Sequence, residues 1–198
     1  MNLLFQAIKS PVNTLHFLKD KTFSNYWLFM WLVGLGTVYY LAFQEIDVVF
    51  SSWITFIISI ILAIPSIWLV ASIFALIEYP FLKLLGGQVT LKSLRHTEYI
   101  SSAPLALALP IFVIWSFISP NTFFLDTGGI AGTIGFLLMT ILGTWSFIVM
   151  LYVLSAAASI SKWRAFFALV IVSIIVILLF VIIAIVVFII IAILSMTL

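Results

Sequence analysis

The chain has 198 residues, of which 66% are hydrophobic and 7% are charged, and its mean hydropathy is +1.40. A soluble domain of this length must present a polar exterior to water, so the composition excludes an ordinary soluble protein and predicts an all-α polytopic membrane bundle. The net charge of +2 comes from basic residues spread over three segments, which argues against nucleic-acid binding, and the absence of cysteine excludes disulfides and thiolate metal sites.

Residues 1–25 form the first predicted unit, a cytosolic amphipathic segment. Met1–Ile8 is a short apolar run without a basic flank, which does not fit a secretory signal peptide. Ser10 and Pro11 predict a helix start, with Ser10 as the N-cap and Pro11 at the first helical position. Apolar residues then recur at three-residue spacing: Val12, Leu15 and Leu18. We expect this helix to lie in the membrane interface, as an anchor for the first span or as a membrane-binding switch.

Residues 26–198 form the second unit, a membrane domain of five predicted transmembrane helices, since a helix crosses a bilayer with about 20 apolar residues. The predicted spans are 26–43, 53–77, 102–118, 130–156 and 164–196. Pro65 lies inside the second span, and Pro104 and Pro110 lie inside the third, so we expect both helices to be kinked. Such kinks either serve packing or shape a cavity.

The basic residues predict the orientation of the chain. All eight lie before the first span, between the second and third, or between the fourth and fifth: Lys9, Lys19, Lys21, Lys83, Lys92, Arg95, Lys162 and Arg164. The other connections carry acidic residues, Glu45 and Asp47 after the first span and Asp126 after the third. Basic residues are retained in the cytosol, so the N-terminus is expected inside and the C-terminus outside. The basic segments are expected to meet anionic lipid headgroups.

The fourth span is rich in glycine, at positions that fall close to one helical face: Gly128, Gly132, Gly135 and Gly143. Small residues allow helix backbones to approach closely in a membrane. The pattern fits packing within the monomer or a homo-oligomer interface, and the sequence does not choose between them.

The most polar stretch runs from residue 78 to residue 104. Gly86 and Gly87 predict a helix end, and Thr90 predicts the cap of a new helix. On that helix Lys92, Arg95 and His96 share a face because they are three and four residues apart. The candidate interaction residues of this stretch are Glu78, Lys83, Gly86, Gly87, Lys92, Arg95, His96, Glu98, Tyr99 and Pro104.

Glu78 is an ionisable residue close to the hydrocarbon boundary, where such residues are costly and are functional candidates. The alternative is a structural role, in which Glu78 reaches water or pairs with Lys83 or Arg95. His16 and His96 alone do not supply the three or four ligands of a zinc site. No nucleophile, metalloprotease or phosphate-loop motif is present. The sequence therefore predicts a protein that is not an enzyme and that needs no metal or cofactor.

Three local patterns resemble the Yip-one domain family, whose eukaryotic members are Rab-interacting membrane proteins and which has many small bacterial members. They are Lys9-Ser10-Pro11 at the N-terminus, the series Leu85-Gly86-Gly87, Thr90-Leu91-Lys92, Tyr99 and Pro104, and Gly143-x-Trp145 leading to Lys162 and Arg164 before an aliphatic last helix. The resemblance covers nearly the whole chain and implies five spans with the N-terminus inside. The long cytosolic N-terminal region of the eukaryotic members is missing, so their trafficking role does not carry over. The short form resembles the bacterial members and implies the cytoplasmic (inner) membrane.

Two functions fit the sequence. The first is a non-enzymatic adaptor or membrane-organising protein that acts through the cytosolic segment between spans two and three, on anionic lipid or a protein partner. The second is a small solute or ion transporter or channel, suggested by the prolines and Glu78. Against the second, the span centres carry only hydroxyl groups, such as Ser59, Ser66, Thr140 and Ser173.

Overall fold

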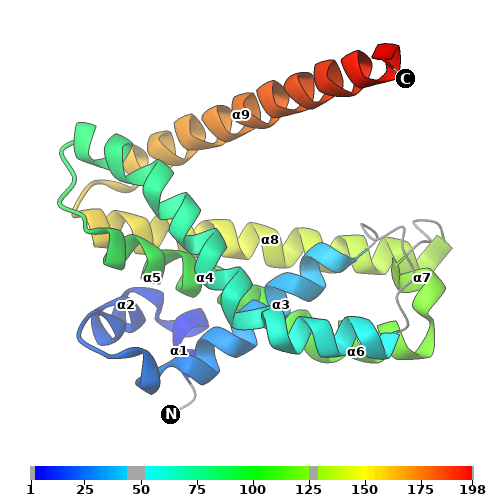
Figure 1. The fold of residues 1–198 in the computed structure, drawn as a ribbon. Coiled ribbons are helices and arrows are strands. Elements are labelled where there is room, and N and C mark those ends of the chain that lie inside the picture. Colours follow the sequence, from blue (N-terminus) through cyan, green and yellow to red (C-terminus); the bar gives the residue numbers. More distant parts are fainter. Residues whose placement is uncertain (1–2, 44–51, 125–128, 198) are drawn as a thin grey trace.

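The computed structural model describes residues 3–43, 52–124 and 129–197, and all regular structure in these residues is helical. Figure 1 shows a bundle from which the last helix diverges. The elements are α1 (Leu3–Lys9), α2 (Pro11–Lys19), η1 (Phe23–Asn25), α3 (Trp27–Ala42), α4 (Ser52–Leu84), α5 (Leu91–Ser101), η2 (Ala103–Ala108), α6 (Leu109–Ile118), α7 (Pro120–Phe124), α8 (Gly129–Ala158) and α9 (Lys162–Thr197), where η marks a 3₁₀ helix.

The predicted all-α fold is confirmed for the described residues. Within the described residues, three helices are long and apolar enough to cross a membrane: Trp53–Leu84, Leu91–Ile118 and Gly132–Ala158. A shorter apolar helix covers Trp27–Ala42. The last helix, α9, contacts α4 and α8 and then runs away from the bundle (Figure 1). Beyond Val172, most of the large apolar side chains whose burial the structure describes are exposed, as expected of a helix that faces lipid.

The prolines lie differently from what the sequence predicts for the second and third spans. The second span is expected to end at Ile77, but α4 continues through Pro80 to Leu84. Pro104 and Pro110 are not in helix interiors: they occupy the opening positions of η2 and α6. The missing N–H of proline costs no hydrogen bond there. The third apolar helix is therefore interrupted by a 3₁₀ segment, and it is continued towards the N-terminus by α5.

The N-terminal segment is part of the bundle. Pro11 begins α2 as predicted, and Ser10 is at the N-cap position, but the Ser10 side chain makes no capping bond. The sequence did not predict α1. This helix ends at Lys9 because the next residue, Ser10, precedes a proline, and a residue in that position disfavours the α-helical conformation. Leu15 and Leu18 of α2 are buried, and α2 packs on α5 and α8.

Two of the glycines in the fourth predicted span pack inside the monomer. A Cβ at Gly135 would overlap the Phe43 ring, and a Cβ at Gly143 would lie 2.9 Å from the Tyr40 hydroxyl. Gly132 is buried, and Gly128 lies outside the described residues. Whether this helix also forms a homo-oligomer stays a prediction.

Two glycines of α3 lie very close to the backbones of other helices. A Cβ at Gly34 would overlap the Ala63 carbonyl of α4, and a Cβ at Gly36 would lie 2.6 Å from Ala106 Cα in η2. Small residues permit such contact where lipid supplies no hydrophobic drive for helix association. These two glycines thus bring α3 against α4 and η2.

We expect the substitution Gly36→Val to lower the free energy of unfolding by about 2 kcal/mol or more, because the new side chain overlaps backbone that cannot rotate away. Thermal unfolding in detergent measures the change. Leu41→Ala, an exposed site on the same helix, is the control and should change stability by about 0.5 kcal/mol or less. Equal effects of the two substitutions would contradict the close packing of α3.

Candidate functional site around helix α5

A glycine turn joins α4 to α5. Gly86 has a φ of +82°, which favours glycine. The Gly86 N–H donates to the Lys83 carbonyl (3.0 Å), and the Gly87 N–H donates to the Leu82 carbonyl (2.8 Å). These two bonds form a Schellman motif, so the predicted helix end at this glycine pair is confirmed. The next N–H, of Gln88, donates to the Ala158 carbonyl at the end of α8 (2.9 Å), which attaches the turn to the bundle.

Thr90 starts α5 as predicted. Its side chain accepts a hydrogen bond from the Ser93 N–H (3.1 Å), and the Ser93 hydroxyl oxygen accepts one from the Thr90 N–H (3.2 Å). This reciprocal pair is a capping box that satisfies two donors at the helix start. The cap fixes the residue at which α5 begins.

One face of α5 lines a cavity of about 240 Å³, which we call the basic pocket. The α5 residues in it are three or four apart, the spacing of one helical face: Lys92, Arg95, His96 and Tyr99. The opposite wall comes from η1, α3 and α4, and its residues are Phe23, Tyr26, Met30 and Trp68. Lys92, Arg95 and His96 share a face, as predicted from the sequence. The aromatic residues of the opposite wall were not predicted. Spacing within one helix cannot reveal which side chains of other helices will face it.

The two cations of the basic pocket are not neutralised by acids. The Lys92 Nζ donates to the Lys19 main-chain carbonyl at the end of α2 (3.0 Å), so two of the basic segments meet here. The acidic residues that the structure describes are Asp20, Glu78 and Glu98, and none of them lines the pocket. The ionised side chains that line the pocket are therefore both cations.

His96 lies at the base of the basic pocket and is only 2% exposed. Its Nε2 is 3.4 Å from the Tyr26 hydroxyl, and the two rings meet edge to face at 5.6 Å. The other ring nitrogen, Nδ1, is buried without a hydrogen-bond partner in the described part of the chain. An unsatisfied buried nitrogen costs free energy, which a hydrogen-bonding partner at Nδ1 would recover.

Glu78 pairs with another acid. It is 2% exposed, and its carboxyl group hydrogen-bonds to that of Glu98 across the contact between α4 and α5. The predicted pairing of Glu78 with Lys83 or Arg95, or its access to water, is therefore wrong. A carboxyl–carboxyl hydrogen bond requires a proton on one of the two groups. One oxygen of each residue, Glu78 Oε2 and Glu98 Oε1, is buried without a partner among the described residues.

The remaining predicted site residues lie outside the pocket. Lys83 is near the end of α4, with its Nζ 5.7 Å from the centre of the Tyr79 ring. Pro104 is buried in η2. The structure thus brings Lys92, Arg95, His96 and Tyr99 together, and it places the Glu78–Glu98 pair between α4 and α5, away from the pocket.

His16 and His96 both line a second cavity, of about 220 Å³, between α2, α5 and α8. Among the described residues no group of three histidine, cysteine, aspartate or glutamate side chains is placed to hold a metal ion. This cavity therefore has polar walls without a metal-binding geometry.

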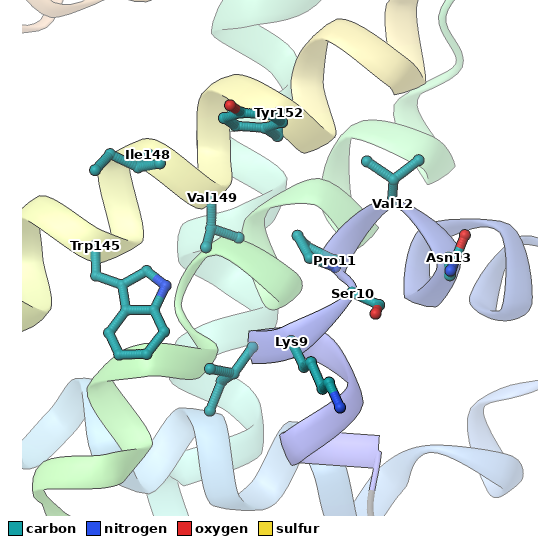
Figure 2. Close-up of a pocket in the computed structure, with 10 residues that line it drawn as sticks. Lys9, Ser10, Pro11, Val12, Asn13, Trp145, Ile148, Val149 and Tyr152 are labelled. Atoms are coloured by element: carbon teal, nitrogen blue, oxygen red, sulfur yellow. The ribbon is translucent and has the colours of Figure 1, made fainter.

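A larger groove, of about 490 Å³, separates the junction of α1 and α2 from α8. Figure 2 shows Trp145, Ile148 and Tyr152 on α8 facing the segment that contains Pro11. Its polar side chains, Lys9, Ser10 and Asn13, are exposed or half-buried. No buried polar group lines the groove, in contrast to the basic pocket.

The chain matches no protein-family model, no curated protein and no solved structure at a significant level.

The carboxyl pair predicts a difference between two substitutions of Glu78. Glu78→Gln keeps a hydrogen bond, because the amide can donate to the Glu98 carboxylate, and it should change the free energy of unfolding by about 1 kcal/mol or less. Glu78→Ala leaves Glu98 buried without its partner and should cost about 1–3 kcal/mol more. Thermal unfolding in nanodiscs compares the two. If Glu78→Ala were no less stable than Glu78→Gln, the pairing would be refuted.

Proposed function

We propose that this chain is a non-enzymatic adaptor or membrane-organising protein that acts through the basic face of α5. The observation that carries the proposal is that Lys92, which hydrogen-bonds to the end of α2, and Arg95 both line a pocket that no acidic residue of the described chain lines. A surface of this kind binds negatively charged groups by complementarity of charge.

The proposed topology has five spans, with the N-terminus in the cytosol and the C-terminus outside. The spans are α3, α4, the segment formed by η2 and α6, α8 and α9, and α5 lies at the cytosolic end of the third span. Supporting it, the basic connections lie at one end of the bundle, where the turn at Gly87 packs on Ala158 and Lys162 lies over the Tyr152 ring. Retention of basic residues in the cytosol then assigns this end to the inner face. The acidic connections with Glu45, Asp47 and Asp126 lie outside the described residues.

The resemblance to the Yip-one domain family is part of the proposal. Its support is that the residues carrying it meet in one structural unit: Gly86 and Gly87 form the turn, Thr90 caps α5, and Tyr99 faces the basic pocket. A bacterial cytoplasmic membrane is the location that this resemblance implies.

Neutralising Lys92 and Arg95 should abolish recovery of the partner while leaving the protein folded. The measurement is chemical cross-linking in native membranes, followed by purification and mass spectrometry of the wild type and K92Q/R95Q. The matched control is K162Q/R164Q, which removes the same charge from another connection at the same end. Partner recovery that is unchanged in K92Q/R95Q, or lost equally in both variants, would contradict an adaptor role for α5.

A second candidate function, transport coupled to protons, is favoured by the Glu78–Glu98 pair. A buried carboxyl pair that shares a proton inside membrane helices is typical of proton relays. In liposomes with an entrapped pH dye and an imposed potential, proton entry should then be lost in E78Q. Proton entry that is the same with wild type, E78Q and protein-free liposomes would rule out this function.

A further inference from the structure

The basic pocket has the donor groups of an anion site. Lys92 and Arg95 provide two positive charges, and no acidic residue of the described chain lines the pocket. Tyr26 and Tyr99, which carry hydroxyl groups, line the same cavity, and His96 adds a buried ring whose Nδ1 has no partner among the described residues. Charged donors of this type, assisted by neutral hydroxyl and imidazole donors, bind phosphate oxygens well.

The dimensions of the pocket limit its occupant to a small group. Its volume of about 240 Å³ is below the range of roughly 300–1,000 Å³ that is usual for drug-sized ligands. A phosphate ester of glycerol is of suitable size, whereas a whole lipid is too large. Any attached hydrocarbon chains must therefore leave the pocket.

The pocket walls provide an exit for such chains. Lys92, in the first turn of α5, is exposed, whereas Tyr99 lies two turns further along the helix and is buried. On the facing wall, Phe23 and Trp68 keep 48% and 51% of their surfaces exposed. Exposed aromatic side chains beside a charged mouth are the arrangement found where proteins meet the lipid–water interface. The pocket thus has charged residues on one wall and exposed apolar residues on the other. A phospholipid has the same two parts, a charged headgroup and hydrocarbon chains.

We propose that the basic pocket binds the phosphate-bearing headgroup of an anionic phospholipid, whose acyl chains lie on the apolar surface beside Phe23 and Trp68. Lys92 and Arg95 bind the phosphate oxygens, and the tyrosine hydroxyls and His96 complete the polar lining. The proposal rests on the proposed function in using the same face of α5, and it names a lipid as one ligand of that face.

Trp68 is a natural probe of this site. The full-length protein is reconstituted in phosphatidylcholine bilayers that contain a small equal fraction of either brominated phosphatidylglycerol or brominated phosphatidylcholine. The difference between wild type and W68F isolates the quenching of Trp68 from that of the other tryptophans. We expect stronger quenching of Trp68 by the anionic lipid.

The variant K92Q/R95Q should lower the preference for the anionic lipid about thirty-fold, the factor that two basic residues contribute at an anionic membrane surface. K162Q/R164Q should keep the wild-type preference. If the double variant folds poorly, K92Q and R95Q separately should each lower the preference about fivefold. The absence of a preference in wild type, its persistence in K92Q/R95Q, or an equal loss in K162Q/R164Q would overturn the proposal.

Soluble glycerol phosphate is added in excess to distinguish the two sources of a phosphate ester. A bound lipid should keep quenching Trp68, because its acyl chains hold it at the site. Relief of the quenching by soluble glycerol phosphate would overturn the lipid in favour of a soluble ligand. The outcome is independent of the cross-linking experiment: a partner lost in K92Q/R95Q without any lipid preference refutes only the lipid site, and a lipid preference without a partner refutes only the adaptor.

Discussion

The glycine turn between α4 and α5 is the constraint on which the position of every polar group in the candidate site depends. A left-handed conformation such as that of Gly86 costs an L residue roughly 1–2 kcal/mol, so the chain reverses here at least cost with glycine. Gly87 leaves no room for a side chain between the Leu82 carbonyl and Ala158. The hydrogen bond from the Gln88 N–H to the Ala158 carbonyl then attaches the turn to α8, α5 packs against α4 and α8, and the Thr90 cap fixes where α5 begins.

Structural features that depend on residues close together in the sequence were predictable. The apolar runs locate α3, α8 and α9 to within a few residues, the glycine pair locates the end of α4, and helical spacing places Lys92, Arg95 and His96 on one face. Features that depend on contact between distant segments were not. Nothing around Glu78 in the sequence indicates that it faces Glu98, because the carboxyl contact arises from the packing of α4 against α5. The continuation of α4 through Pro80 was missed for a similar reason: local propensity disfavours it, and packing against α5 and α9 overrides that propensity.

The arrangement of α9 agrees with a bilayer as the solvent of this fold. Ala165 and Ala168, in its first turns, are buried against α4 and α8, whereas Ile177 and Phe188 are 61% and 73% exposed. Water would disfavour such a surface strongly, at about 25 cal/mol per Å² of exposed apolar area. Lipid removes this penalty, and because all backbone groups of a helix are satisfied internally, a single helix can leave the bundle without loss. The polar residues of α5, in contrast, contact other helices of the protein, at the end of the bundle where the basic segments meet.

The acidic pair and the basic pocket are linked through α5. Arg95 and Glu98 are three residues apart, the spacing at which opposite charges on a helix usually pair. Glu98 hydrogen-bonds to Glu78 of α4, while Arg95 lines the basic pocket, which no acidic residue of the described chain lines. Burying Glu98 in a carboxyl pair thereby leaves the Arg95 charge available to a ligand. A helix whose arginine was already neutralised by its own glutamate would have little affinity for an anion, so the contact between α4 and α5 supports the binding face without touching its ligand.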